Sequence, residues 1–196
     1  MIRALRNIAR RFAADTRGTV IVETVLVLPL LIWMVLAIVV FVDAFRMQTQ
    51  NIRATYTIGD ALSRQLNAVA PSYLEGMQRL YSYQIRRSYP TGLRITVAYY
   101  DAEEDEHVRV WSCSTGIADD PMTQTDIDAI KDEIPQLADG DTIALIDSWM
   151  DYTPPFDMAI GAIEARLEEM RFENRIFVSP RFTGQLKLTD AGSGNC

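Results

Sequence analysis

A single carboxylate interrupts the start of the most apolar part of this 196-residue chain. Glu23 lies five residues after Gly18, and the 18 residues from 25 to 42 carry no charged side chain. A carboxylate at the centre of a bilayer costs about 2.5–3.5 kcal/mol, so such a residue normally has a partner. Cleavage after Gly18 would create one, because the new α-amino group of Thr19 would lie one helical turn from Glu23. The alternative is a glutamate that reaches the lipid headgroups and contacts only water.

The charge around this segment is distributed asymmetrically. Residues 1–18 carry five arginines and one aspartate, a net charge of +4, whereas the other 178 residues carry 14 basic and 25 acidic side chains, a net charge of −11. Basic residues gather on the cytoplasmic side of a membrane span. The sequence therefore predicts a single-pass membrane protein, with residues 1–18 in the cytoplasm and everything after about Phe45 outside. The acidic head has no basic face for phosphate groups, which argues against a nucleic-acid partner.

Two simpler interpretations of the apolar segment stay open. Eighteen residues of helix cover roughly 27 Å, close to the ~30 Å hydrocarbon core, so an ordinary uncleaved anchor is possible. A cleaved secretory signal normally has an apolar region of about 7–15 residues, which is shorter than this one. Residues 42–44 nevertheless resemble a poor signal cleavage site, and cleavage there would leave Phe45 at the new N-terminus.

Residues 18–29, with the sequence GTVIVETVLVLP, resemble the N-terminal segment of the TadE-like family of pseudopilins. These are minor pilins of the Tad (Flp, type IVb) pilus. In that family a prepilin peptidase cleaves after the glycine, a glutamate is the fifth mature residue and a proline interrupts the apolar helix. The resemblance thus implies cleavage between Gly18 and Thr19, an assembly role for the Glu23 carboxylate and a helix kink at Pro29.

The same resemblance implies partners and a location. The partners are the prepilin peptidase, other minor pilins, the major Flp pilin and the Tad inner-membrane assembly platform with its cytoplasmic ATPase. The cleaved chain would leave the inner membrane for the pilus or its base. Thr24 departs from the family, which commonly has a bulky residue there. The alternatives are an uncleaved, membrane-anchored periplasmic binding or sensor module and a pseudopilin of an unrelated secretion system.

Other potentially reactive side chains give weaker signals. Cys113 and Cys196 are an even pair, which outside the cytoplasm predicts a disulfide that would stabilise the head by about 4 kcal/mol. His107 has no recognisable nucleophile context, so the sequence predicts no enzyme. The acidic run at residues 101–106 raises a calcium hypothesis, but its spacing fits no known loop and a solvated hairpin tip is favoured. No metal or cofactor is expected.

Hydrophobic periodicity predicts the helices that precede the head and open it. One helix is expected over residues 20–67, about 70 Å long, with Pro71 ending the segment. A second helix is expected to follow, with capping-box spacing at residues 72–75. Its predicted apolar face comprises Leu74, Met77, Leu80, Tyr81 and Ile85.

Alternating apolar residues predict a hairpin whose strands include residues 93–99 and 108–111. A short helix capped by Thr123 is expected to be ended by Pro135. The further elements expected are a turn at 139–141, a strand at 142–152, a helix at 156–170 packed on the sheet, and strands at 175–180 and 182–188. The stripe that predicts the last helix comprises Phe156, Ile160, Ile163, Leu167 and Met170.

Helices and strands that do not alternate regularly favour an α+β fold with an antiparallel sheet. About 150 residues suffice for one such domain. The predicted organisation is a basic cytoplasmic leader at residues 1–18, a transmembrane and extended helix at 19–67, and a periplasmic α+β head at 68–196. Together with the family resemblance, this implies a pilin-like architecture.

Overall fold

The chain divides into two compact units in a computed structural model of the protein. The structure describes residues 18–85, 89–154, 158–160, 163–165, 170–189 and 196. The predicted basic leader therefore lies outside the described residues, except for Gly18. One unit comprises Met1–Val42 with Phe156–Arg166, and the other comprises Asp43–Pro155 with Leu167–Cys196. We call the second the head unit.

The longest element is helix α2, Thr19–Ser63, which has 45 residues. The predicted long helix is confirmed, although it ends four residues earlier than expected. Pro29 lies inside it. Within the head unit, its buried residues recur at steps of three and four, which is the spacing of one helix face. They include Met47, Asn51, Ala54, Thr55, Ile58 and Leu62.

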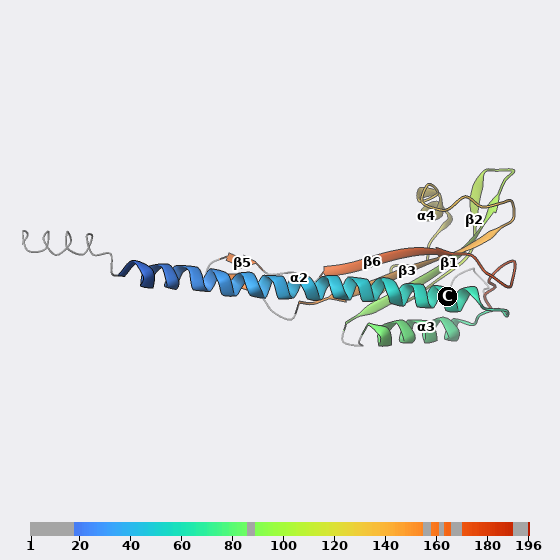
Figure 1. The fold of residues 1–196 in the computed structure, drawn as a ribbon. Helices are drawn as coiled ribbons and strands as arrows, with labels where there is room; N and C mark the ends of the chain where they lie inside the picture. The colour runs from blue at the N-terminus through green and yellow to red at the C-terminus, as the bar shows by residue number, and fades with distance from the viewer. Residues whose placement is uncertain (1–17, 86–88, 155–157, 161–162, 166–169, 190–195) are drawn as a thin grey trace, which may run out of the picture. The chain divides into compact units, whose positions relative to one another are not determined.

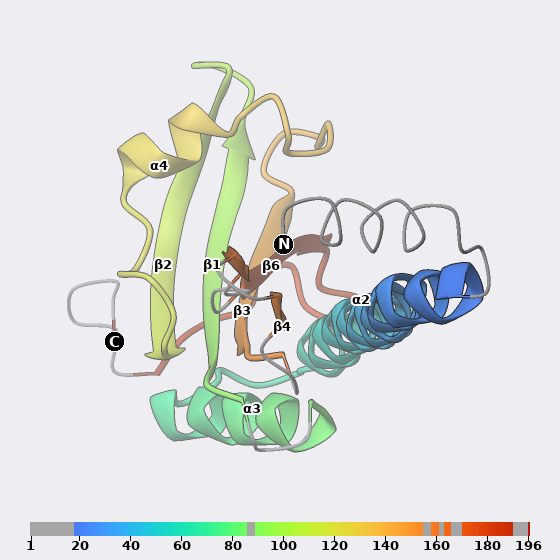
Figure 2. The same ribbon diagram turned by 90° about the vertical axis from the view of Figure 1, so that its left-hand side faces the viewer.

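A four-stranded antiparallel sheet forms the centre of the head unit, in the order β2-β1-β3-β6 (Figures 1 and 2). The predicted α+β class with an antiparallel sheet is confirmed, as are the hairpin and the strand at residues 142–152. The strands are β1, Thr91–Asp101; β2, Glu106–Gly116; β3, Thr142–Tyr152; and β6, Met170–Val178.

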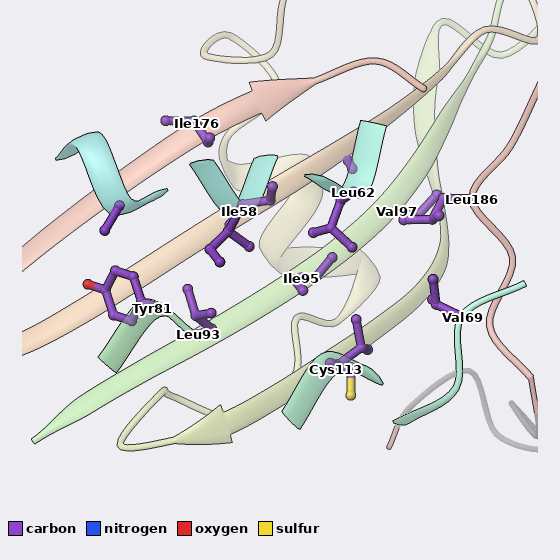
Figure 3. Close-up of a cluster of buried hydrophobic side chains, with 14 of the residues drawn as sticks. Ile58, Leu62, Val69, Tyr81, Leu93, Ile95, Val97, Cys113, Ile176 and Leu186 are labelled. Atoms are coloured by element: carbon purple, nitrogen blue, oxygen red, sulfur yellow. The ribbon is translucent and has the colours of Figure 1, made fainter. Parts of the chain in front are cut away.

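Both faces of this sheet are covered, because successive residues of its strands enter different apolar clusters. Ala144 and Ile146 of β3 belong to the core shared with α2 and α3, Pro71–Gln84 (Figure 3). Ile143 and Leu145 pack with α4, Gln124–Ala129. The two-residue alternation of a strand thus places α4 on the face opposite α2 and α3.

A β-bulge interrupts the alternation of side chains in β2. Simple alternation would place Val110 and Trp111 on opposite faces of the strand. In the structure the register shifts so that Val97 pairs with Trp111 and Ala98 pairs with Arg109. The extra residue turns Trp111 into the core, where its Nε1 donates a hydrogen bond to the Leu186 carbonyl at 2.8 Å.

Helix starts differ from prediction in one case and agree in another. The capping box predicted at residues 72–75 is wrong, since Ala70 is the N-cap and makes no side-chain cap bond. Pro71 begins α3 instead of merely ending the preceding segment, because its fixed φ and missing N–H suit a first helical turn. Leu80, expected on the apolar face, is exposed. The cap at Thr123 is confirmed, although α4 ends at Ala129, before Pro135.

The helix predicted at residues 156–170 is wrong for the described residues. Met158–Ile160 (β4) and Ile163–Ala165 (β5) pair as antiparallel strands, and β6 begins at Met170. Short apolar runs do not separate helix from strand by periodicity alone, and Gly161 weakens a helix there. Two residues of the expected stripe, Phe156 and Leu167, lie outside the described residues.

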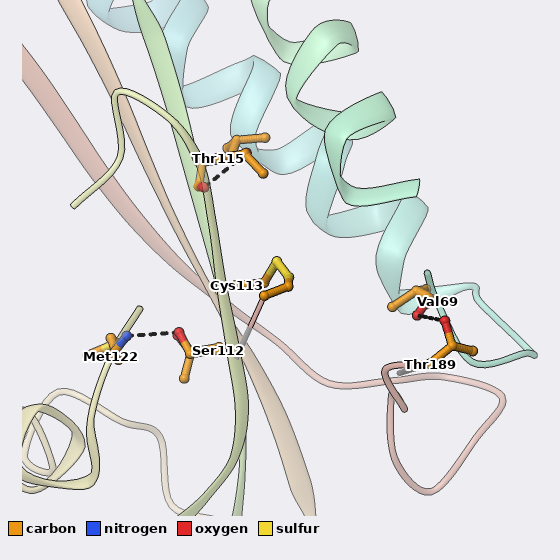
Figure 4. The surroundings of a disulfide bond; sticks show 9 residues. Val69, Ser112, Cys113, Thr115, Met122 and Thr189 are labelled. Atoms are coloured by element: carbon orange, nitrogen blue, oxygen red, sulfur yellow. Dashed lines mark hydrogen bonds between the residues drawn. A yellow bond between two sulfur atoms is a disulfide. The ribbon is translucent and has the colours of Figure 1, made fainter. Parts of the chain in front are cut away.

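The strand predicted at residues 182–188 is also wrong. This segment forms bends, and only Leu188 makes an isolated parallel bridge, to Val69. Bonds around that bridge hold the segment beside the start of α3. Thr189 N donates to the Val69 carbonyl at 2.8 Å, and Thr189 Oγ1 donates to the same carbonyl at 3.2 Å (Figure 4). Separate hydrogen bonds to different parts of the head stabilise this segment, including one from Thr142 to the Gly184 carbonyl and one from Trp111 to the Leu186 carbonyl, without a ladder of strand hydrogen bonds.

Candidate functional site

The first part of α2 is an exposed apolar helix. Its sequence is long and apolar enough to cross a membrane, with a mean hydropathy of 3.2 in the best 18-residue window. Only 6% of that window is buried, whereas the core helix of a soluble protein would be mostly covered. Many large apolar side chains between Ile21 and Val42 are exposed; Val25, for example, is 65% exposed. A continuous apolar surface of this kind is normally covered by lipid or by other proteins.

Gly18 directly precedes this helix and has no structural reason to be glycine. It is exposed, and a Cβ added to it would meet no atom within 4 Å. Its φ also lies outside the left-handed region that favours glycine. Within the described part of the chain, the fold therefore sets no limit on the size of the side chain at this position.

Glu23 lies on α2 one helical turn after Thr19, with an exposed side chain. Among the described residues, no ion pair involves its carboxylate. Its neighbours Val22 and Val25 are exposed apolar residues. The structure therefore places one charge within an apolar helix surface and leaves the charge available to a partner. Pro29 follows within the same surface, where its missing N–H leaves one carbonyl of the preceding turn without its helical bond.

The next acidic residue, Asp43, is held by the head unit. The Tyr152 hydroxyl donates a hydrogen bond to Asp43 Oδ2 at 2.8 Å. Tyr152 is the last residue of β3 and is fully buried, so this bond ties the beginning of the head part of α2 to the end of a central strand. Glu23 and Asp43 thus differ, because Asp43 bonds within the fold whereas Glu23 has no ion pair among the described residues.

A buried polar network fixes how α2 lies on the sheet. Asn51 Oδ1 accepts hydrogen bonds from the Tyr81 hydroxyl of α3 and from Ser148 Oγ of β3, the second at 3.2 Å. Thr55 Oγ1 lies 2.7 Å from Ser148 Oγ. Satisfied polar groups in a core specify one arrangement, because any rotation of the helix would leave them unpaired. The sequence offers one signal for this network: polar Asn51 and Thr55 occur at core-facing positions of the helix.

The phenols of this region give a pH dependence. Burial raises the pKa of Tyr81, and burial together with the hydrogen bond to Asp43 raises the pKa of Tyr152. The unfolded chain therefore loses these protons first, near the ordinary tyrosine pKa of about 10. Their contribution to stability is complete below that pH and is lost as the pH rises toward the folded-state pKa values.

We therefore expect the urea midpoint of the full chain in detergent to fall steeply above about pH 10. The Tyr81→Phe and Tyr152→Phe variants should lose about 1 kcal/mol of stability near pH 8, because each removes a buried hydrogen bond. Each should also show a shallower alkaline decline. Tyr83→Phe, on an exposed phenol of α3, is the control. An alkaline slope that is identical in all four proteins would contradict this assignment.

A cluster of charged side chains lies on the α4 face of the sheet. Asp147 is buried and its two carboxylate oxygens accept from Arg94, at 2.8 and 3.0 Å, and from Arg175, at 2.6 Å. The Arg94 guanidinium also stacks on the Trp149 ring, 5.0 Å from its centroid. Opposite charges are matched within this cluster, which suits a structural role.

The acidic hairpin tip is a solvated turn between β1 and β2. Asp105 adopts a positive φ of 54°, and its Oδ1 accepts from the Tyr100 hydroxyl at 2.7 Å. A hydrogen bond with Glu104, together with repulsion from neighbouring carboxylates, raises the pKa of Glu106. In the described part of the chain, no group of three or more His, Cys, Asp and Glu side chains could hold a metal ion.

His107 lies beside this tip, with its ring 5.2 Å from that of Tyr100. It borders an open pocket of about 450 Å³ together with Lys131 and Asp132. Burial lowers the pKa of His107, so the ring is neutral at physiological pH. The structure brings no cysteine or metal ligand set to this pocket among the described residues.

The two cysteines are joined in a disulfide, with Cα atoms 5.0 Å apart (Figure 4). Cys113 is a buried residue of β2, and Cys196 is exposed. The bond closes a separation of 83 residues. It attaches the end of the chain to the same strand that carries Trp111, whose indole bonds to the Leu186 carbonyl.

These features define a class of protein: an α+β head attached to one helix that is suited to cross a membrane. Comparisons with protein-family models, curated proteins and solved structures found no match to this chain.

Proposed function

We propose that this chain is a minor pilin, or pseudopilin, that acts in the assembly of a Tad (Flp, type IVb) pilus. The observation that carries the proposal is the combination at the start of α2. An exposed glycine precedes an exposed apolar helix, and a carboxylate follows one turn into that helix; among the described residues the glycine packs against nothing and the carboxylate has no ion pair. Cleavage after Gly18 gives each of these features a purpose.

In this proposal, residues 1–18 stay in the cytoplasm and the apolar part of α2 spans the inner membrane. A prepilin peptidase removes the leader, and the new α-amino group of Thr19 pairs with a Glu23 carboxylate. The pair lies within one subunit or between neighbours. The partners are other minor pilins, the major Flp pilin and the Tad assembly platform of the inner membrane. The head lies in the periplasm or in the pilus, and its role is structural.

N-terminal sequencing of the mature protein tests the proposal. A chain that begins at Thr19 supports it. A chain that begins at Met1 would instead indicate an uncleaved periplasmic binding or sensor module, and one that begins at Phe45 would indicate an ordinary exported protein.

The Gly18→Ala variant sharpens the test. We expect the cleaved fraction to fall by about tenfold, because a peptidase that binds the small residue would exclude the added methyl group. The fold gives no competing explanation, since a Cβ at Gly18 meets nothing within 4 Å. Gly76→Ala is the matched control, because that glycine also has open space around it. Normal cleavage of the Gly18→Ala chain, measured on immunoblots of membranes, would rule out this site.

A further inference from the structure

The two edges of the head sheet are treated differently by the fold. The outer edge of β2 is protected by its bulge and by one side chain that bonds to backbone N–H and C=O groups, as a neighbouring strand would. Gln124 Nε2 donates to the His107 carbonyl at 2.6 Å, and Gln124 Oε1 accepts from Arg109 N at 2.8 Å. Natural sheets use such devices to prevent unwanted strand pairing. The opposite edge, β6, pairs with β3 through nine successive residues without a register shift.

The hydrogen bonds of the sheet identify which groups of β6 face outward. Asp151 N donates to the Pro90 carbonyl, and Tyr100 N donates to the Asp141 carbonyl. In an antiparallel ladder the bonding direction alternates by residue, so odd-numbered residues of β3 bond to β1 and even-numbered ones bond to β6. Even-numbered residues of β6 therefore bond inward. The residues whose N–H and C=O groups point outward are Arg171, Glu173, Arg175 and Phe177.

Within the part of the chain that the structure describes, no hydrogen bond reaches these outward backbone groups. Two neighbouring side chains of β6 also lack partners in this described part; they point to opposite faces of the sheet because they are consecutive in the strand. Glu173 is exposed and has no ion pair among the described residues, and Asn174 Nδ2 is buried without a partner. A row of free backbone groups beside an unpaired charge and an unpaired amide is what an incoming strand requires.

Helix α2 gives this edge an apolar border. Gly59 lets the helix approach β6 closely, since a Cβ there would lie 2.8 Å from Ile176 Cδ1 and 2.9 Å from Val178 Cγ2. Tyr56 is one turn earlier on the same flank and is 60% exposed. A strand added to β6 would therefore cover the side of Tyr56 as well as the backbone edge.

The occupant is not a second copy of this chain. Tyr152, which pairs with Met170 at the start of β6, contacts Asp43, whereas Gly59 lies against the other end of β6. Helix α2 thus runs parallel to β6. If two β6 strands paired antiparallel, the two Asp43 residues would lie at opposite ends of the joined sheet. In the proposed function, on which this step rests, both copies enter one membrane, and this requires both Asp43 residues to lie at the same end.

The remaining self-pairings fail for reasons of hydrogen bonding. Parallel pairing about a two-fold axis along the strands would place Glu173 of one copy opposite Glu173 of the other. In parallel strands, a residue that bonds across the new interface lies opposite one that bonds away from it. Two copies of the same outward-bonding residue therefore cannot pair. Pairing of β6 with the β2 edge of a neighbour is opposed at His107 and Arg109, because the Gln124 side chain already bonds to their backbone groups.

We propose that β6 is a docking edge for an extended segment of a different polypeptide, which joins the sheet as a fifth strand. The chemistry of the edge defines that segment. It carries a basic residue opposite Glu173 and an oxygen-bearing side chain opposite Asn174, and it presents an apolar residue to Tyr56.

Photo-cross-linking in cells that assemble the protein tests this edge. The probe is p-benzoylphenylalanine at position 56 of the full chain, and the control probe is at exposed Glu75 of α3. Three backgrounds are compared: the natural Glu173, Glu173→Ala and Glu173→Pro. Proline removes one outward N–H and is tolerated at a strand edge, whereas alanine keeps that N–H. Amide exchange of β3 in the purified variants checks that the head is folded.

The expected result is an adduct to a different polypeptide from position 56 and not from position 75. Glu173→Ala should reduce its yield by no more than about threefold, and Glu173→Pro by at least about tenfold, because it removes a main-chain bond and opposes a strand. An adduct with the mass of two copies, no adduct at position 56, or equal yields in the alanine and proline variants would each overturn the proposal. N-terminal sequencing of the same samples reports cleavage after Gly18 separately, so failure of the proposed function is recognised independently.

Discussion

Replacing Asp147 with alanine is expected to lower the free energy of unfolding of the head by about 3–5 kcal/mol. The carboxylate is 4% exposed and accepts from two guanidinium groups. Its removal leaves Arg94, whose side chain is only 11% exposed, without an anion. A buried charge without a counter-charge costs far more than the net value of the original pair, which is why the expected effect is large.

Asp151→Ala is the matched control for this prediction. Asp151 lies on the same strand and face, but it is 25% exposed and its ion pair with Arg171 is longer, at 3.6 Å. Exposed pairs contribute about 0–1 kcal/mol, so the control should lose little stability. Urea unfolding of the full chain in detergent, followed by tryptophan fluorescence, measures both variants. Equal losses in the two would show that the Asp147 cluster is not a buried ionic centre.

Loss of the Glu23 carboxylate is expected to reduce the amount of this protein in sheared pili by about tenfold or more. In the proposed function, the α-amino group of Thr19 would lose its counter-charge in an apolar environment, where an uncompensated charge is costly. Cleavage after Gly18 should stay largely intact in Glu23→Ala, because the carboxylate lies beyond the cleaved bond. Glu23→Gln keeps the shape and the hydrogen-bonding capacity and should also fail, since it removes the charge.

Immunoblots of pilus and membrane fractions measure this effect, with N-terminal sequencing as the check on cleavage. Glu75→Gln provides a control carboxylate, because Glu75 is exposed on α3 and pairs only with its helical neighbour Arg79 at 3.5 Å. Normal incorporation of Glu23→Gln would exclude a charge-based assembly role. Loss of cleavage in that variant would instead assign Glu23 to recognition by the peptidase.

Local patterns predicted the elements whose neighbours along the chain decide their conformation. The long apolar run required a helix, and α2 begins within a residue of its predicted start. The strand at residues 142–152 has its predicted bounds, because a turn precedes it and prolines follow it. The helix predicted at residues 156–170 failed for the described residues, since apolar steps of three and four also occur in short paired strands.

The candidate site residues also fall into two groups, those that local sequence patterns indicate and those that only the tertiary structure brings together. Gly18 and Glu23 were found from the sequence because their spacing and charge context are local. The network of Asn51 and Ser148 joins residues 97 apart, and no pattern within one element predicts which strand will lie beneath a helix. The open edge of β6 likewise depends on strand order, which is a property of the whole sheet.

The sequence by itself thus determined that a charged leader precedes an apolar helix, that one carboxylate interrupts this helix, and that an α+β head follows. These features depend on composition and on periods of two to four residues. Only the tertiary structure decided which charges are used within the fold. It paired Asp43 with Tyr152 and Asp147 with Arg94, over separations of 109 and 53 residues, and left Glu23 without a partner among the described residues. Such pairings follow from strand order, register and helix rotation, which chain neighbours do not specify.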